Sequence, residues 1–173
     1  CELENEYNKK VYNVLQLRMH EKIIGLKKKM SEDNSKTKHD VILTYITSRG
    51  PWYKYSWKGD NEKSGGISTN IGIHFFDMLL WIFGQTQDYR VHLFEENKAS
   101  GFIELENANI RWFLSIDDND LPDEAREKNQ RTYRSIKIDG QEVEFSDGFT
   151  DLHTIVYDKV INGEGYVIDD ARA

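Results

Sequence analysis

Three polar side chains in one otherwise apolar run have the types and the spacing to move a proton. Asn70, His74 and Asp77 are spaced four and three residues apart, so on a helix they project from the same face. A neutral imidazole in this setting can accept a proton from a hydroxyl group. A structural histidine, paired with Asp77 one turn away, is the simpler alternative, because buried polar groups are normally paired. Both interpretations stay open at this point.

The run that carries these side chains has the pattern of a buried helix between glycines. Apolar residues recur in two rows, which are Ile67, Ile71, Phe75, Met78 and Ile82, and Ile73, Phe76, Leu80 and Phe83. A helix that is apolar on two sides is mostly buried. At its entry, Gly65 and Gly66 let the backbone approach a ligand closely. Ser68 and Thr69 in the first turn suit an anionic group at the helix N-terminus.

Several stretches of the sequence resemble one enzyme family. The helix is similar to the G-G-x-x-x-D-x-G-x-H-x-x-D helix of the glucose-fructose oxidoreductase, inositol dehydrogenase and MocA family (Gfo/Idh/MocA). More closely, four stretches resemble its WlbA-type UDP-sugar-uronate 3-dehydrogenases, namely Leu43–Gly50, Ser56–Asp60, Lys63–Gly66 and Gly148–Thr154. In that family the helix histidine is a catalytic acid and base, a role that carries over onto His74. Asn70 stands where most of the family has aspartate, so it can only be a hydrogen-bond partner.

The resemblance adds candidate substrate contacts. Arg18 stands where the family's chain crosses between its two domains, beside the sugar site, which implies a phosphate or carboxylate contact. From sequence alone, a solvated surface cation is the simpler interpretation of Arg18. Lys58 is the preferred second cation for an acidic sugar, and His153 resembles a family position near the substrate. The predicted substrate-binding residues are Arg18, Lys58, Ser68, Thr69, Asn70, Asp77 and His153.

The loop predicted at 48–60 is unusually aromatic. It carries Trp52, Tyr53, Tyr55 and Trp57. Three explanations compete: a folded-down lid with its own small core, an oligomer contact, or a platform for a ligand ring. The sequence leaves all three open.

Composition bounds the class of protein. The 173 residues allow one domain with a sizeable core, and 38% hydrophobic and 31% charged residues fit a globular chain rather than a disordered or membrane-spanning one. A net charge of -7 argues against a nucleic-acid surface, so an anionic substrate must meet a local cluster of cations. The single cysteine, Cys1, excludes an internal disulfide and fits a reducing compartment. Because His20, His39 and His92 lack suitably spaced acidic or thiol partners, no metal is expected.

Periodicity predicts an α/β (α+β) fold around the central helix. The expected elements are the end of a helix at 2–8, a strand at 11–17, an amphipathic helix at 23–30, a strand at 41–47, strands at 89–94, 100–105 and 108–116, a charged loop at 117–128, a hairpin at 133–145 and a helix at 149–161. In the last helix, Leu152, Ile155, Val156 and Val160 form the expected core side. The fold predicted is an open, mainly antiparallel sheet with helices on one face, as in the Gfo/Idh/MocA C-terminal substrate-binding domain.

A dinucleotide-binding motif is missing from the sequence. The 12 glycines include no G-x-G-x-x-G after a strand, and no Glu-Lys pair continues into proline as the family's catalytic Glu-Lys-Pro does. The resemblance then implies that the Rossmann domain is absent. Residues 1–18 are expected to be the tail end of that nucleotide-binding domain and a crossover strand, and residues 19–173 the substrate-binding and oligomerisation domain. NAD is expected in the full-length parent and no cofactor in this fragment, which alone should be inactive.

The resemblance implies NAD-dependent oxidation of the 3-hydroxyl of UDP-N-acetylglucosaminuronic acid. The implied setting is cytoplasmic, in surface-polysaccharide (lipopolysaccharide O-antigen) biosynthesis, with a UDP-sugar substrate and no nucleic-acid or membrane partner. A homodimer or homotetramer through the sheet face is expected. One alternative is a dehydrogenase of another sugar or cyclitol in the same family. The other is a non-catalytic assembly module, in which the polar helix residues are only structural.

Overall fold

The computed structural model describes residues 2–33, 37–143, 145 and 148–172. The expectations for Cys1 and for Glu144 of the predicted hairpin lie outside these ranges. The fold is an open sheet of six strands, which run in the spatial order β3 (Thr86–Phe94), β4 (Lys98–Leu105), β5 (Ala108–Ser115), β2 (His39–Thr47), β6 (Thr132–Ile138) and β7 (Gln141–Val143). The pair β2 and β5 is parallel and the other neighbours are antiparallel. This confirms the predicted open, mainly antiparallel sheet.

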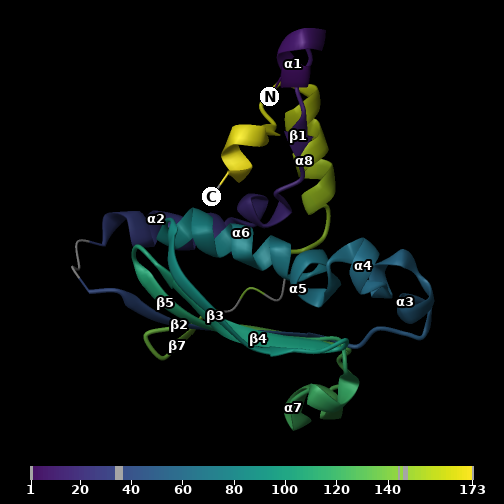
Figure 1. Cartoon of the computed structure of the whole chain (residues 1–173). Coiled ribbons are helices and arrows are strands. Elements are labelled where there is room, and N and C mark those ends of the chain that lie inside the picture. The colour runs from purple at the N-terminus through teal and green to yellow at the C-terminus, as the bar shows by residue number, and fades with distance from the viewer. Residues whose placement is uncertain (1, 34–36, 144, 146–147, 173) are drawn as a thin grey trace.

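One face of the sheet carries the core. Figure 1 shows α2 (Glu21–Glu32) and α6 (Gly72–Phe83) lying across this face. Alternate strand residues point toward them, including Leu43 on β2, Trp112 opposite it on β5 and Ile136 opposite it on β6. From α6, Met78, Leu79 and Phe83 are buried against these strand residues. The two apolar rows therefore predicted the buried helix correctly.

The single helix predicted from Ile67 to Phe83 is two helices. α5 (Gly66–Asn70) ends before Ile71, and the segment Asn61–Asn70 is bent by 43° from α6. Gly72 stands at the start of α6, where a Cβ would lie 2.7 Å from the Phe76 ring and 2.9 Å from the Leu114 side chain. A larger residue would push α6 away from the sheet, so close packing at Gly72 fixes the start of α6.

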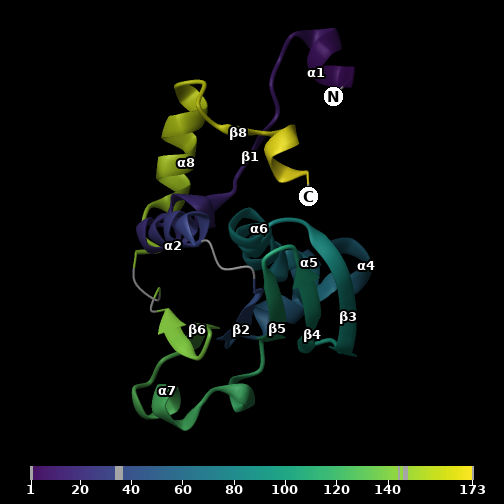
Figure 2. The same cartoon turned by 90° about the vertical axis from the view of Figure 1, so that its left-hand side faces the viewer.

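Segments from both ends of the chain stand together on the far side of α2 and α6 from the sheet (Figures 1 and 2). They are α1 (Glu2–Tyr7), β1 (Tyr12–Asn13), η1 (Gln16–Met19), α8 (Leu152–Ile161), β8 (Tyr166–Val167) and η4 (Ile168–Ala171). The strand expected at 11–17 is wrong in length, because β1 has only the two-residue β8 to pair with. Ile155 is 41% exposed rather than on the core side, since α8 packs through Leu152 and Val156.

Two predicted loops contain short helices. The aromatic loop at 48–60 folds into α3 (Trp52–Tyr55) and η2 (Trp57–Gly59), followed by α4 (Asn61–Ser64). The charged loop at 117–128 contains η3 (Asp118–Asp120) and α7 (Asp123–Glu127). α7 lies on the other side of the sheet from α6, where Leu121 and Ala125 pack against Ile46 (Figure 1). Helices are therefore not confined to one face.

Within the described ranges, no single helix is long and apolar enough to cross a bilayer. The bent pair of Asn61–Asn70 and Gly72–Phe83 meets the length and composition criteria together, as core helices of globular proteins can. In this chain Ile67, Met78 and Phe83 of that pair belong to the core cluster.

Candidate active site

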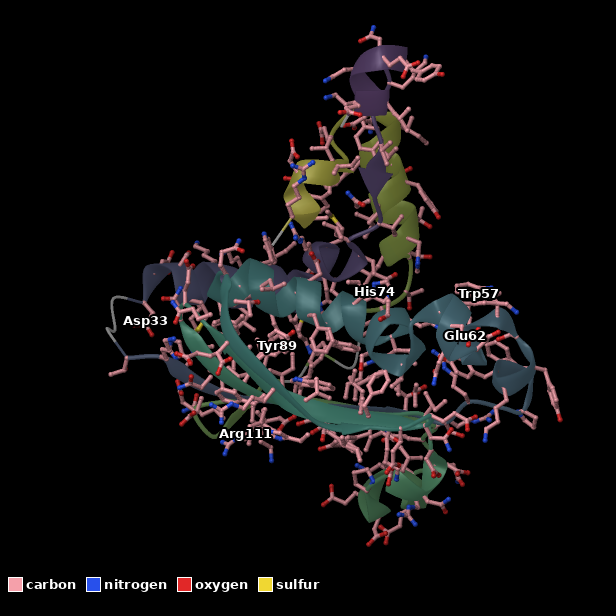
Figure 3. The ribbon with its side chains drawn as sticks, in the orientation of Figure 1. Asp33, Trp57, Glu62, His74, Tyr89 and Arg111 are labelled. Atoms are coloured by element: carbon pink, nitrogen blue, oxygen red, sulfur yellow. The ribbon has the colours of Figure 1, made fainter. Side chains whose placement is uncertain are left out.

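A cavity of about 330 Å3 opens where α6 meets the sheet, the start of α8 and the α3–η2 segment. Its two histidines are His74, in the first turn of α6, and His153, in the first turn of α8. Figure 3 shows His74 beside the lower end of α8. Asn70 of α5 also lines the cavity, and so does Lys58 of η2. The structure thus brings together four of the residues predicted for the site.

His74 is placed to be a neutral base. Burial lowers its pKa below the usual value of 6.5, and the charge on His153 lowers that pKa further. The charge on Asp77 raises the pKa by a smaller amount. Burial disfavours the charged imidazolium, so the ring stays neutral and able to accept a proton near neutral pH.

The cavity is locally cationic in an acidic chain. Arg49, Lys58 and Arg134 line it, and none of the described lining residues is Asp or Glu. Arg49 is exposed, whereas Lys58 and Arg134 are half-buried. The expected local cluster of cations is therefore present despite the net charge of -7. Such a cleft concentrates anionic ligands.

Arg134 is a site residue that sequence analysis did not propose. Its guanidinium carbon lies 4.2 Å from the ring centroid of Phe149 and 5.4 Å from that of Tyr45. Its Nε is buried without a hydrogen-bond partner. An unsatisfied buried donor costs about 1–3 kcal/mol. The available signal was an arginine at a core-facing position of the predicted hairpin, two residues before Ile136.

Asn70 holds one wall of the cavity in place. Its Nδ2 donates to the Tyr53 hydroxyl at 3.1 Å and to the Lys58 carbonyl oxygen at 3.4 Å. Gly59 allows the tight path of this wall, because a Cβ there would lie 2.6 Å from the Tyr53 carbonyl oxygen. These contacts fix the backbone that carries Lys58. A direct contact between Asn70 and substrate stays a prediction.

The aromatic loop is anchored to the main core by one of its four aromatic residues. Tyr53 is 4% exposed and belongs to the core cluster, while Trp52 lines the cavity beside it. Tyr55 and Trp57 are 90% and 59% exposed, and Figure 3 shows Trp57 at the outer surface of this segment. The loop therefore has no separate core around Tyr53 within the described residues, and its role as a platform for a ligand ring stays a prediction.

Asp77 and Arg18 form a separate buried ion pair. Arg18 Nε donates to Asp77 Oδ2 at 3.0 Å and its NH2 group donates to Asp77 Oδ1 and to the Asp170 carbonyl oxygen. The rings of Trp81 and Tyr166 flank the guanidinium at 5.7 and 5.1 Å. Arg18 is therefore not a solvated surface cation. It is 7% exposed because Asp77 neutralises it.

The predicted pairing of His74 with Asp77 is not found. No hydrogen bond joins the two within the described ranges, since Arg18 binds both carboxylate oxygens. Asp77 and Arg18 line a neighbouring cavity of about 650 Å3, not the cavity of His74. Their predicted contact with substrate is untested, and their contacts in this structure are structural.

Comparison with known proteins places the chain in a family. Residues 37–117 match the model of the Gfo/Idh/MocA family, described as "Oxidoreductase family, C-terminal alpha/beta domain". The structure of the WlbA (WbpB) dehydrogenase from Thermus thermophilus with NAD and alpha-ketoglutarate is 52% identical over 98% of this chain, with a TM-score of 0.92. The chain belongs to the Gfo/Idh/MocA oxidoreductase family.

Other members of the Gfo/Idh/MocA family also match. The same Thermus thermophilus dehydrogenase in complex with NAD and UDP-GlcNAcA is 50% identical over 98% of this chain, with a TM-score of 0.91. WlbA from Bordetella pertussis, at 18% identity over 92% of this chain, shares the fold with a TM-score of 0.69. The chain spans 54% of the length of each of these three structures.

Ser68 and Thr69 were predicted to contact an anionic ligand at the helix N-terminus that follows Gly65 and Gly66. Neither residue lines the cavity of His74. Ser68 lines an apolar groove of about 390 Å3 between α6 and the inner face of β3, and its Oγ is buried without a partner. Thr69 is exposed and packs on Gly65. Successive helical residues point about 100° apart, so on the short α5 only Asn70 of these three faces the cavity. In this Gfo/Idh/MocA member, Ser68 and Thr69 therefore do not line the cavity of His74.

The histidine pair yields a prediction about the pKa of His74. Replacing His153 by glutamine removes a charge that lowers this pKa, so the pKa of His74 should rise in His153→Gln. It should still stay below 6.5, because burial is the larger cause. NMR titration of the His74 ring measures it, with His92→Gln on the exposed strand β3 as a control that leaves it unchanged. An unchanged pKa in His153→Gln would show that the two rings do not interact.

The same shift makes stability depend on pH. As the pH falls below 6.5, His74 binds a proton in the unfolded chain before it does so in the folded chain. The free energy of unfolding therefore decreases as the pH falls, until the pH is below the pKa of His74 in the folded chain. In His74→Gln this component should be missing. Urea unfolding at a series of pH values checks it, and an identical pH profile in both proteins would contradict it.

Proposed function

We propose that this chain is the substrate-binding domain of an NAD-dependent dehydrogenase that oxidises the 3-hydroxyl of UDP-N-acetylglucosaminuronic acid. The observation that carries the proposal is a neutral His74 in a cavity whose described lining residues include three cations, Arg49, Lys58 and Arg134, and neither Asp nor Glu. That substrate presents a diphosphate and a carboxylate, both anionic. A relative solved with NAD and UDP-GlcNAcA is 50% identical over 98% of this chain.

The proposed chemistry gives His74 the role of general base. The neutral ring nitrogen takes the proton of the 3-hydroxyl as the C3–O bond becomes a carbonyl. NAD, when bound, accepts the hydride that leaves C3 with the electron pair of the broken C–H bond. Burial keeps His74 unprotonated for this step, while Arg49 and Lys58 draw the anionic substrate into the cavity.

In this proposal the full-length protein has two domains, one that binds NAD and one that binds substrate. The sequence has no G-x-G-x-x-G motif, so NAD would be held by a nucleotide-binding domain of which residues 1–18 are the tail end. Residues 19–173 would bind substrate and self-associate. By resemblance to WlbA-type enzymes, the setting would be cytoplasmic and the product would enter surface-polysaccharide, such as O-antigen, biosynthesis.

The two alternatives explain less of the site. A neutral cyclitol offers no anionic group to the cations Arg49, Lys58 and Arg134. An assembly module with a purely structural His74 has no use for a cation-lined cavity beside that histidine. The acidic sugar nucleotide accounts for both features.

The first test is the substitution His74→Asn in the full-length protein. Loss of the general base should lower kcat by about 100- to 10,000-fold and change KM far less. Steady-state kinetics of NADH formation with UDP-N-acetylglucosaminuronic acid measure both. His92→Asn, on the exposed strand β3, serves as the matched control and should keep normal kcat. Near-normal turnover in His74→Asn would make His74 a core histidine.

The second test uses the 173-residue chain itself. It should bind no NAD, yet associate through the sheet face opposite α6, from which Arg111 projects (Figure 3) and where Ile42 is 39% exposed. Calorimetric titration with NAD and light scattering on the same sample measure the two properties. Saturable NAD binding would overturn the domain assignment, and a monomer at all concentrations would overturn the oligomer proposal.

A further inference from the structure

Arg134 sits at a core-facing position of the sheet. It pairs in register with Tyr45 of β2 and lies on the same face of β6 as Ile136 and Ile138. Tyr45 is 7% exposed and belongs to the core cluster. The guanidinium carbon lies 4.2 Å from the ring centroid of Phe149 and 5.4 Å from that of Tyr45. Packing against these two rings therefore sets the position of the guanidinium before any ligand binds.

Arg134 lacks the partner that a buried structural arginine has. Its Nε is buried without an acceptor, and no hydrogen bond or ion pair joins its side chain to any other residue in the described ranges. Arg18 provides the contrast within the same chain, because Asp77 binds its Nε and NH2 groups and Asp170 accepts a further bond. Among the described residues, Arg18 has a carboxylate partner and Arg134 has none, so Arg134 can bind an anion that enters the cavity.

The cations of the cavity fall into two groups. Arg49 and Lys58 come from the segment at 49–59, and they lie toward solvent, Arg49 being exposed. Arg134 comes from strand β6 of the sheet, and its Nε is buried. A planar guanidinium matches two oxygens of a carboxylate or of a phosphate in a bidentate pair. The depth of each cation makes the assignment: the inner Arg134 suits the carboxylate on the sugar ring, and the outer Arg49 and Lys58 suit the diphosphate.

From this arrangement we infer that Arg134 is the residue that selects a sugar acid over a neutral sugar, by binding the carboxylate at C6. Arg49 and Lys58 bind the diphosphate, which acidic and neutral UDP-sugars share. The inference deepens the proposed function and rests on it, because it takes the ligand of this cavity to be a UDP-sugar. Arg134 is thus a specificity-determining residue.

A binding comparison on the full-length protein with NAD tests this role. Calorimetry gives the Kd of UDP-N-acetylglucosaminuronic acid and of UDP-N-acetylglucosamine, which differ only in the charged group at C6. Arg134→Gln should weaken binding of the acid by about 30-fold or more, as loss of one partner of a desolvated charge pair does. Binding of the neutral sugar should change little, so the preference for the acid is lost.

Two further variants make the result specific. Arg49→Gln is the matched control, and it should weaken binding of both sugars by the same factor. Arg134→Lys keeps the charge without the planar fork, and it should recover only part of the preference. Thermal unfolding of each variant without ligand shows whether it is folded, and the ratio of the two Kd values is unaffected by a uniform loss of folded protein.

The outcomes separate this inference from the proposed function. If Arg134→Gln weakens both sugars equally, or keeps the preference for the acid, Arg134 does not read the carboxylate and the inference is overturned while the proposed function stands. If the unsubstituted protein binds neither UDP-sugar, the proposed function fails, and the inference fails with it.

Discussion

The close packing of α6 on the sheet is the constraint on which the candidate site depends. Gly72 lets the start of α6 lie against Leu114, and the bend before it turns α5 so that Asn70 reaches the α3–η2 segment. One turn later His74 faces the cavity, and Asp77 faces away from it toward Arg18. Asn70, His74 and Asp77 thus have three different surroundings: Asn70 positions the wall that carries Lys58, His74 lines the cavity, and Asp77 neutralises a buried cation. A shift of α6 by a fraction of an ångström would disturb all three.

The two buried arginines, Arg18 and Arg134, differ in how their positive charge is stabilised. A buried ion pair is costly to form and more costly to break, so Arg18 with Asp77 ties η1 to α6 without offering anything to a ligand. Arg134 is held as firmly, by rings rather than by a carboxylate, and its charge remains available. The low pKa of His74 agrees with this division, since a neutral imidazole adds no further charge to a cavity that already has three cations. Burial therefore sets the protonation state of the base, while the arginines and Lys58 supply the attraction for anions.

Local sequence patterns predicted the helices and strands. The candidate site depends on contacts between residues that are far apart in the sequence. The two apolar rows of 67–83 and the hairpin at 133–145 depend on neighbouring residues and were predicted from sequence. The turn of this hairpin is Asp139-Gly140, with φ of +51° and +80°. The break between α5 and α6 at Ile71 could not be predicted from sequence. It follows from the close approach of Gly72 to Leu114 of β5, which is distant in the chain. The role of Arg134 depends on the register of β6 against β2, and the burial of Arg18 depends on Asp77 across the fold. Family resemblance pointed to His74 and His153, which the structure places in one cavity with Lys58. It gave no sign of the arginine that packs against Tyr45 and Phe149.

The proposed chemistry requires that His74 receives the proton of the sugar 3-hydroxyl inside the cation-lined cavity. A crystal structure of the full-length protein with NAD and UDP-N-acetylglucosaminuronic acid would show whether it can. We expect a ring nitrogen of His74 within about 2.6–3.2 Å of the 3-hydroxyl oxygen. We also expect the sugar ring to lie between α6 and β6. A sugar bound in the apolar groove beside Ser68, or a 3-hydroxyl in contact with His153 and remote from His74, would contradict it.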